Sequence, residues 1–269
     1  MIQDVSSPAN PAIKLLKSLH AKKNRQESGL FLGEGARLAS EAAEMGIWPE
    51  ILAFSPAAIE REAVQRLIQG AQSQGTRLLR TSEAILQAIT KRDNAQTVIG
   101  AYRQRLAPLA TLAPARRWVA LEAVRDPGNL GTILRTADAA GAGGVLLVDG
   151  GCDPFSPEAV RASMGSIFSL GLARVSFEEC EAWRRGQNLA LIGTSLEASQ
   201  RLEALDPMEG FVLLMGNEQS GLPPAMARAC DALIRLPMAG AADSLNLAVA
   251  TGIALYGLWS KHGYDGANR

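Results

Sequence analysis

The chain has few of the side chains that usually carry acid–base or metal chemistry. Its 269 residues include only 2 histidines and 3 cysteines. His20 lies among basic residues near the N-terminus and His262 lies in a polar tail, so neither is placed for imidazole catalysis. The cysteines are odd in number and have no C-x-x-C spacing, which argues against a disulfide framework and a structural zinc site. The sequence therefore predicts no bound metal.

Long apolar runs are also absent. No stretch approaches the roughly 18–20 apolar residues that a membrane helix needs. The N-terminal MIQDVSSPANPAIK lacks a basic segment followed by an apolar one, so no secretory signal is visible. Because 47% of the residues are hydrophobic and 20% are charged, the composition is that of a globular protein. We therefore expect a cytoplasmic protein without a membrane partner.

The chain has no net charge, but its charge is unevenly distributed. Residues 1–110 hold 14 Lys and Arg against 10 Asp and Glu, a net of +4, and residues 111–269 hold 13 against 17, a net of −4. The first 26 residues contain five basic side chains and one acidic one. This basic cluster is either a solvated helix face or a surface that contacts phosphates. It includes Lys22, Lys23 and Arg25.

A stretch with prolines and no clear period, RQRLAPLATLAPAR, divides the chain. It predicts a small α/β domain over 1–105, a linker over 106–116 and a second α/β domain over 117–269. In the first domain we expect helices over 11–23, 34–46, 56–69 and 82–89, and strands over 50–54, 76–81 and 96–102. In the second, continuous apolar strands alternate with helices, which predicts a mostly parallel sheet covered on both faces.

Three loops of the second domain follow predicted strands and carry polar side chains. In open α/β sheets, ligands bind beyond the carboxyl ends of strands. The first loop is DPGNLGTILR, in which Asn129 is expected to cap a helix that exposes Arg135. The second, LLMGNEQSGL, presents Glu218 between two glycines. The third, LPMAGAADSLN, offers Ser244 as the expected cap of the last helix, with Asn246 in its first turn. Taken singly, each loop is also explained by capping, a turn or a solvated side chain.

Together the three segments RDPGNLGTILRTADAAG, LLMGNEQSGL and IRLPMAGAADSLNLAVATGIAL resemble, in order, the signature motifs of the SpoU/TrmH RNA ribose 2′-O-methyltransferases. VRASMGSIFSLGLARV resembles the segment that the family has between the first two motifs. The N-terminal NPAIKLLKSLHAKKNRQESGLFLGEGARL is similar to the family's substrate-binding domain, which is related to a ribosomal-protein fold. Asp126 departs from the pattern, since the family most often has Asn there.

The resemblance implies a SPOUT fold, a parallel sheet with helices on both faces whose chain forms a trefoil knot. It implies S-adenosylmethionine as cofactor, held by loops that correspond to seven residues of this sequence, namely Thr194, Ser195, Leu196, Gly216, Leu236, Met238 and Leu245. It assigns catalysis to five others, namely Asn129, Arg135, Glu218, Ser244 and Asn246. A guanidinium is effectively never deprotonated in proteins, so we expect Arg135 to orient the hydroxyl and its phosphate, with Glu218 orienting Arg135 or accepting the proton.

The resemblance further implies a homodimer formed through the C-terminal domain, and RNA as substrate, contacted by Lys22, Lys23, Arg25 and Arg135. Ribosomal RNA is favoured because of the N-terminal domain, and transfer RNA is the alternative. An inactive RNA-binding factor with this fold is a second alternative, against which the complete set of motif residues argues. A dinucleotide-binding enzyme is a third, but the chain lacks G-x-G-x-x-G.

Overall fold

The computed structural model describes residues 1–94, 96–198 and 200–267, and the chain divides into two compact units. Unit 1 contains Met1–Gln104 and Asp153–Phe168, and unit 2 contains Arg105–Cys152 and the chain from residue 169 onward. The sequence predicted one continuous domain over 117–269. Residues 153–168 instead group with the N-terminal unit, so the chain passes between the units three times.

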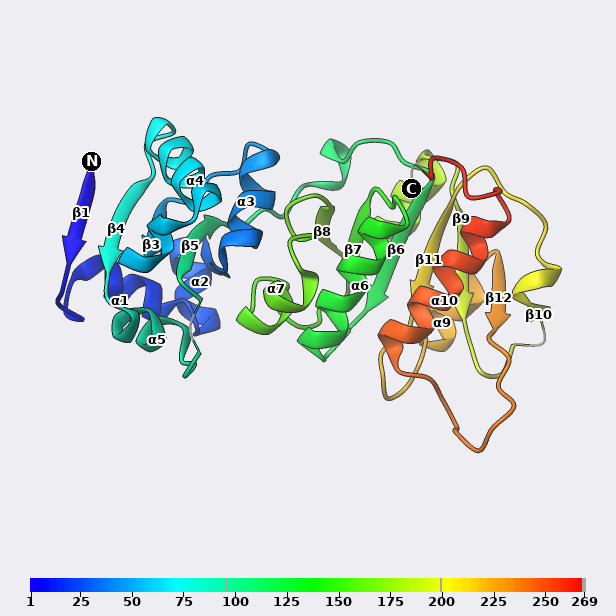
Figure 1. Ribbon diagram of the computed structural model, residues 1–269. Coiled ribbons are helices and arrows are strands. Elements are labelled where there is room, and N and C mark those ends of the chain that lie inside the picture. The colour runs from blue at the N-terminus through cyan, green and yellow to red at the C-terminus, as the bar shows by residue number, and fades with distance from the viewer. Residues whose placement is uncertain (95, 199, 268–269) are drawn as a thin grey trace. The chain divides into compact units, whose positions relative to one another are not determined.

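Unit 1 is built on a five-stranded sheet in the order β1-β4-β3-β5-β2 (Figure 1). β1, β4 and β3 are parallel, whereas β5 is antiparallel to both β3 and β2. One face of the sheet packs on α1 (Pro11–Ser18) and α5 (Glu83–Thr90), and the other on α3 (Ala36–Glu44) and α4 (Glu62–Ser73). Side chains alternate between the two faces of each strand and so contribute to two separate apolar cores. The strands are β1 (Ile2–Val5), β2 (Leu30–Glu34), β3 (Ile51–Phe54), β4 (Arg77–Thr81) and β5 (Val98–Arg103).

Two predicted helices of unit 1 differ from the structure. The helix expected over 11–23 is broken at residues 19–21 into two short helices. The helix expected over 56–69 begins as a 3-10 turn, Pro56–Glu60, before α4 starts. Ser82 caps α5 as predicted, since its side chain accepts a hydrogen bond from the Ile85 N–H. The helices are α1 (Pro11–Ser18), α2 (Lys22–Ser28), α3 (Ala36–Glu44), α4 (Glu62–Ser73), α5 (Glu83–Thr90) and α7 (Pro157–Ser163).

Paired glycines on β2 and β5 make room for a buried aromatic side chain. Gly33 lies opposite Gly100, and a Cβ at either position would come within 2.7 Å or less of the Tyr102 ring. Tyr102 also contacts Phe31 and Phe168, at ring-centroid distances of 5.9 and 4.9 Å. Through such contacts the segment 153–168 completes the apolar core of unit 1.

Unit 2 is built on a seven-stranded, wholly parallel sheet in the order β10-β12-β9-β11-β6-β7-β8, which confirms the predicted parallel architecture. β10 and β8 were not predicted: β10 has only two residues, and the apolar run of β8 is interrupted by Arg174. The strands are β6 (Arg117–Glu122), β7 (Gly144–Val148), β8 (Gly171–Val175), β9 (Ala190–Thr194), β10 (Gln200–Arg201), β11 (Phe211–Met215) and β12 (Ala232–Arg235).

Helices cover both faces of this sheet. α6 (Pro127–Ala139) and α10 (Leu247–Ser260) lie side by side on one face (Figure 1). α8 (Phe177–Gly186) and α9 (Pro224–Ala229) contribute Cys180 and Met226 to the core on the other. Burial raises the pKa of the Cys180 thiol to about 12, so this side chain stays protonated and packs as an apolar group.

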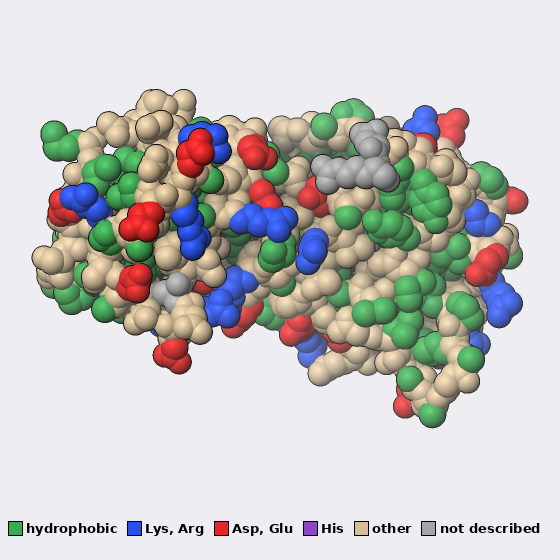
Figure 2. Space-filling model, in the orientation of Figure 1, with side chains coloured by type: hydrophobic (Ala, Val, Ile, Leu, Met, Phe, Trp, Pro, Cys, Tyr) green, Lys and Arg blue, Asp and Glu red, His purple; other side chains and the backbone are tan. Residues whose placement is uncertain are grey.

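α10 is apolar around its whole circumference. Seven of its residues are buried, yet Val249, Ile253 and Tyr256 are 52%, 47% and 39% exposed. Hydrophobic side chains accordingly gather on the surface over α10 (Figure 2). A helix that is hydrophobic all round is normally buried on all sides. No helix in the described residues is both long enough and apolar enough to span a membrane.

Candidate active site

The loops singled out from the sequence meet at one edge of the unit 2 sheet. β12, β9, β11 and β6 are neighbours and parallel, so their carboxyl ends lie together. In register, Ile234 pairs with Thr194 and Met215 pairs with Leu121. The loops after these strands therefore line the position where open parallel sheets bind ligands.

The first loop differs from the prediction in its cap. The N-cap of α6 is Asp126, whose carboxylate accepts a 2.6 Å hydrogen bond from the Asn129 N–H. Asn129 was predicted as the cap, but it lies in the first helical turn, where its side chain is not used by its own helix. A carboxylate at this end also interacts favourably with the helix dipole. The cap thus frees the Asn129 amide for contacts with other loops.

Glu218 binds the beginning of α6. Its carboxylate accepts hydrogen bonds from the backbone N–H groups of Arg125 and Asp126, both at 3.3 Å, and from Asn129 Nδ2 at 3.1 Å. Partial burial raises the pKa of Glu218, but the hydrogen bonds from Asn129 and the backbone outweigh burial and leave this pKa below its ordinary value. Glu218 is therefore ionised at neutral pH. It was predicted to orient Arg135 or to accept a proton, and in the structure it holds Asn129 instead.

Asn246 connects the third loop to the same cluster. It is the N-cap of α10, because its Oδ1 accepts hydrogen bonds from the N–H groups of Ala248 at 2.9 Å and Val249 at 3.3 Å. The prediction that Ser244 caps this helix is wrong; Ser244 is exposed, two residues before the cap. The other end of the Asn246 amide donates to Asn129 Oδ1 at 2.9 Å.

The orientations of both amides follow from these contacts. Two backbone donors require Oδ1 of Asn246 to face α10, so its Nδ2 must point to Asn129. Asn129 then presents Oδ1 to Asn246 and Nδ2 to the Glu218 carboxylate. The result is a polarised hydrogen-bonded chain from the N-terminus of α10 to an anion, in which each amide retains one N–H for a ligand.

Arg135 lies in the second half of α6 and is exposed. No hydrogen bond or ion pair to another described residue holds its guanidinium. The same helix buries a stripe that contains Leu130, Ile133, Leu134 and Ala137. All five donors of Arg135 are thus available to an external anion.

Of the seven predicted cofactor residues, Thr194 ends β9 and the other six lie on the loops at this edge. Gly216 follows β11, and a Cβ there would lie 2.1 Å from the Gly221 carbonyl carbon, so only glycine permits the close return of this loop. Leu196, after β9, is 55% exposed, and Leu245 is 36% exposed. A cavity of about 350 Å³ borders the same loops and is lined by Ala198, Arg201, Arg235, Pro237 and Met238. Glycine and exposed aliphatic side chains suit a nucleoside recognised through backbone groups and apolar contact.

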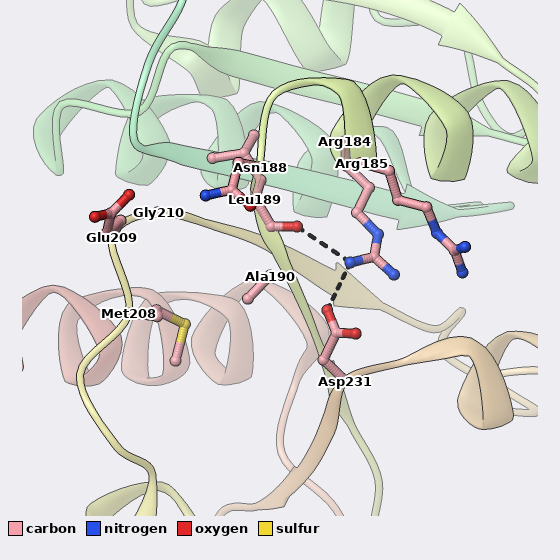
Figure 3. Close-up of a pocket in the computed structure, with 9 residues that line it drawn as sticks. All are labelled: Arg184, Arg185, Asn188, Leu189, Ala190, Met208, Glu209, Gly210 and Asp231. Atoms are coloured by element: carbon pink, nitrogen blue, oxygen red, sulfur yellow. Dashed lines mark hydrogen bonds and ion pairs between the residues drawn. The ribbon is translucent and has the colours of Figure 1, made fainter.

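A second cavity, of about 390 Å³, lies at the opposite edge of the sheet, near the start of β9 (Figure 3). Arg184 borders it but is 5% exposed, and its guanidinium is already bound by Glu181, Asp231 and the Leu189 carbonyl oxygen. This arginine therefore stabilises the loops around β9 and has little capacity left for a ligand.

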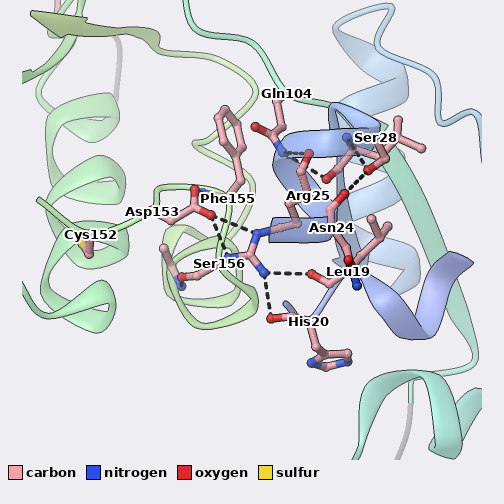
Figure 4. A network of polar contacts seen from close by, with 12 residues as sticks. Leu19, His20, Asn24, Arg25, Ser28, Gln104, Cys152, Asp153, Phe155 and Ser156 are labelled. Atoms are coloured by element: carbon pink, nitrogen blue, oxygen red, sulfur yellow. Dashed lines mark hydrogen bonds and ion pairs between the residues drawn. The ribbon is translucent and has the colours of Figure 1, made fainter. Parts of the chain in front are cut away.

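In unit 1, one predicted RNA contact has a structural role. Arg25 is 3% exposed, and its guanidinium donates to Asp153 at 2.7 and 2.9 Å and to the carbonyl oxygens of Leu19 and His20 at 2.8 Å (Figure 4). It cannot at the same time contact a phosphate. Lys22 and Lys23, on the same helix, are exposed. The sequence could not separate them, because charge alone does not reveal which face of a short helix is buried.

Sequence reasoning missed two buried polar residues of the site. Glu122 ends β6, and Asn217 follows Gly216; each is 8% exposed, and they are hydrogen-bonded to each other. Their signal was available, since a carboxylate at the end of an otherwise apolar strand requires a partner. Asp126 was noted only as a departure from the motif, although it is the cap of α6.

A parallel sheet with polar loops gathered at its carboxyl edge defines an α/β protein of the class that binds ligands beyond its strand ends. Residues 116–256 match the model of the SpoU rRNA Methylase family, and residues 10–100 match that of the MRM3-like substrate binding domain. The chain belongs to the SpoU rRNA methylase family.

Relatives match along nearly the whole chain. The 23S rRNA guanosine 2′-O-methyltransferase RlmP of Bacillus subtilis is 33% identical over 96% of this chain and 99% of its own. The crystal structure of an AdoMet-bound rRNA methyltransferase from Sinorhizobium meliloti has 42% identity and a TM-score of 0.89, covering 96% of this chain and 98% of that one. AviRb from Streptomyces viridochromogenes, in complex with AdoMet, has 28% identity and a TM-score of 0.82, covering 94% and 98%.

These similarities confirm the predicted family and the SPOUT fold class, with an N-terminal α/β domain of the substrate-binding kind. The trefoil knot and the roles of individual site residues stay predictions.

Proposed function

We propose that this protein transfers the methyl group of S-adenosylmethionine to a ribose 2′-hydroxyl of ribosomal RNA. The relatives support this, since they are named as 23S rRNA 2′-O-methyltransferases or as AdoMet-bound rRNA methyltransferases. In this chain, the observation that carries the proposal is the hydrogen-bonded chain of Glu218, Asn129 and Asn246, which joins three separate loops at the ligand-binding edge. A protein that only bound RNA would not need this arrangement at the ligand-binding edge of the sheet.

S-adenosylmethionine, when bound, supplies a sulfonium methyl group that is already activated for transfer. Thr194 at the end of β9, Ser195 and Leu196 after it, and Gly216 would hold it with the help of three apolar residues, namely Leu236, Met238 and Leu245. Covering the exposed side chains of Leu196 and Leu245 would contribute roughly 25 cal/mol for each Å² of apolar surface.

The protein's part is then to place the ribose hydroxyl and to let its proton depart. Arg135 has free donors and permanent charge, so we assign it to orienting the hydroxyl through the neighbouring phosphate. The Nδ2 groups of Asn129 and Asn246 each have a second N–H, which would bind ribose oxygens. Correct alignment of the reacting groups alone removes a large part of the activation barrier in such displacements.

Glu218 is a weak base, because its pKa lies below the ordinary value. Efficient general bases have pKa values near the working pH. We therefore assign Glu218 to fixing Asn129. The hydroxyl proton then passes to solvent water at the exposed edge. Ser244 is exposed near this edge and is assigned to substrate contact.

For RNA outside the reacting nucleotide, we assign phosphate contact to Lys22 and Lys23. Both are exposed on α2, within the part of the chain that matches the substrate-binding domain model. Each phosphate contact releases counterions, so replacing one lysine is expected to reduce the salt dependence of RNA affinity by about one unit of slope.

We also propose that the protein acts as a homodimer through α10. Val249, Ile253 and Tyr256 are four and three residues apart, so they form one exposed apolar stripe. A second copy would bury this stripe. Ile253→Asp is expected to yield a monomer in sedimentation velocity at a concentration where the wild type is dimeric; an unchanged sedimentation coefficient would exclude this face.

The test of the function is methyl transfer from radiolabelled S-adenosylmethionine to deproteinised ribosomal RNA and, in a separate reaction, to transfer RNA, followed by nucleoside analysis. We expect the label on a ribose 2′-oxygen. Arg135→Ala is expected to abolish transfer with cofactor affinity kept, whereas Arg185→Ala, at the opposite edge of the sheet, is expected to be active. Label on a base would contradict the proposal, and label on transfer RNA alone would contradict the substrate.

A further inference from the structure

Glu122 is a buried carboxylate for which the proposed catalytic residues give no reason. It ends β6, is 8% exposed, and forms no ion pair within the described residues. Within the described part of the chain its hydrogen bonds come from one residue, Asn217, through Nδ2 at 2.8 Å and the backbone N–H at 3.3 Å. Burying a carboxylate is costly, and a leucine or valine would fit a strand end at lower cost. The carboxylate is therefore explained by what it does to Asn217.

Asn217 organises the loop that carries Glu218. Its Oδ1 accepts hydrogen bonds from Gln219 N at 3.0 Å, Ser220 N at 2.9 Å and Ser220 Oγ at 3.1 Å. Three donors on Oδ1 force Nδ2 to the opposite side, where Glu122 receives it. The loop is thus wrapped around one amide, and Glu122 fixes the orientation of that amide.

Two anchors then determine where Glu218 lies. Glu122 holds Asn217, the residue before it, and the N–H groups of Arg125 and Asp126 hold the Glu218 carboxylate itself. Both anchors lie between the last residue of β6, Glu122, and the cap of α6, Asp126. The backbone of this segment turns at Ala123, whose φ of 43° is uncommon for a residue with a side chain.

We propose that Glu122 is a positioning residue for methyl transfer, acting through Asn217 to place Glu218 against Asn129. This inference rests on the proposed function. Glu122 itself is assigned no contact with substrate or cofactor. Its effect is on kcat, because a displaced Glu218 would release Asn129 and its link to Asn246.

The pair offers a test by exchange of donor and acceptor. In Asn217→Asp, Oδ1 can still accept from residues 219 and 220, but the second carboxylate oxygen faces Glu122 and is repelled. Adding Glu122→Gln restores a donor, because Nε2 in the place of Oε2 can donate to the carboxylate introduced at position 217, at the expense of the longer contact with the backbone N–H. A merely structural role predicts parallel losses of stability and activity, whereas positioning predicts recovery of kcat on exchange.

We expect Asn217→Asp to lower kcat on ribosomal RNA at least about tenfold, which corresponds to about 1.4 kcal/mol in the transition state. The exchanged pair, Glu122→Gln with Asn217→Asp, should recover most of it. Asp231→Asn is the matched control, because this carboxylate also accepts a backbone N–H, from Leu191 at 2.7 Å, at the other edge of the sheet. It should lower the melting temperature and leave kcat unchanged.

Three results would overturn the inference: wild-type kcat in Asn217→Asp, an exchanged pair that regains wild-type stability but not kcat, or wild-type kcat in Glu122→Leu. The last variant removes the acceptor of Asn217 Nδ2 without adding a charge, so it keeps the test open if Asn217→Asp fails to fold. An inactive wild type would instead contradict the proposed function.

Discussion

Asn246 has two separable tasks, and two substitutions distinguish them. Its Oδ1 caps α10 through the N–H groups of Ala248 and Val249, and its Nδ2 donates to Asn129. Asn246→Ala removes both tasks. Asn246→Asp keeps the cap, since Asp is as good an N-cap as Asn, but replaces the donor to Asn129 with an acceptor.

The magnitudes follow from these contacts. Loss of the cap in Asn246→Ala should cost about 0.5–2 kcal/mol. For a chain of this size, each kcal/mol lowers the melting temperature by roughly 2–4 °C. Asn246→Asp should leave the melting temperature nearly unchanged, while its carboxylate repels Asn129 Oδ1 and turns that amide away from Glu218. We expect kcat to fall about tenfold or more in both variants.

Calorimetry and single-turnover methylation of ribosomal RNA together provide the assay. Ser82→Ala is the matched control, because Ser82 caps α5 in unit 1 in the same way and has no contact with the site. It should lower the melting temperature and keep kcat. Wild-type turnover in Asn246→Asp would refute the hydrogen-bonded chain as a functional unit, whatever the stability of the variant.

Three further predictions concern stability. Glu218→Gln should lower the free energy of unfolding at pH 7, because the pKa of Glu218 is depressed in the folded protein. The difference in this free energy from wild type should be constant above the ordinary pKa of 4.5 and vanish as acid titrates the folded carboxylate. A difference that persists at pH 2 in urea titrations would refute this. Arg25→Ala should lower the free energy of unfolding by about 3–5 kcal/mol, because it leaves Asp153 without its ion-pair partner. The salt dependence of RNA affinity should not change, and a changed salt dependence would show that Arg25 contacts RNA. Gly216→Ala should destabilise unit 2 and weaken cofactor binding, because the Gly221 backbone occupies the space that the new Cβ would need. A melting temperature and a cofactor affinity equal to those of the wild type, both measured by calorimetry, would refute that close approach.

The sequence predicted the parallel architecture of unit 2 because its strands are continuous apolar runs with clear ends. It predicted the segment 153–168 as part of that domain, because nothing in a linear pattern shows that Phe155 and Phe168 pack against Phe31. β2 was overlooked because Gly33, which accommodates Tyr102, lowers its strand propensity.

At the site, the motifs identified the residues but not their division of tasks. Asn129 and Ser244 were predicted as caps from residue type and position. The structure gives capping to Asp126 and Asn246, a few residues away in each loop. Cap preference is shared by Ser, Asp and Asn, so sequence alone cannot choose among neighbours of these types. Contacts between loops, such as Glu218 with Asn129, depend on the order of strands in the sheet, which local pattern does not contain.

The most direct test of the central claim is a map of ribose-methylated nucleotides in ribosomal RNA from cells with and without this protein. We predict that one or more 2′-O-methyl groups disappear on deletion and return with the wild-type chain, but not with Arg135→Ala. An unchanged ribose-methylation map, or full restoration by Arg135→Ala, would contradict the proposed function.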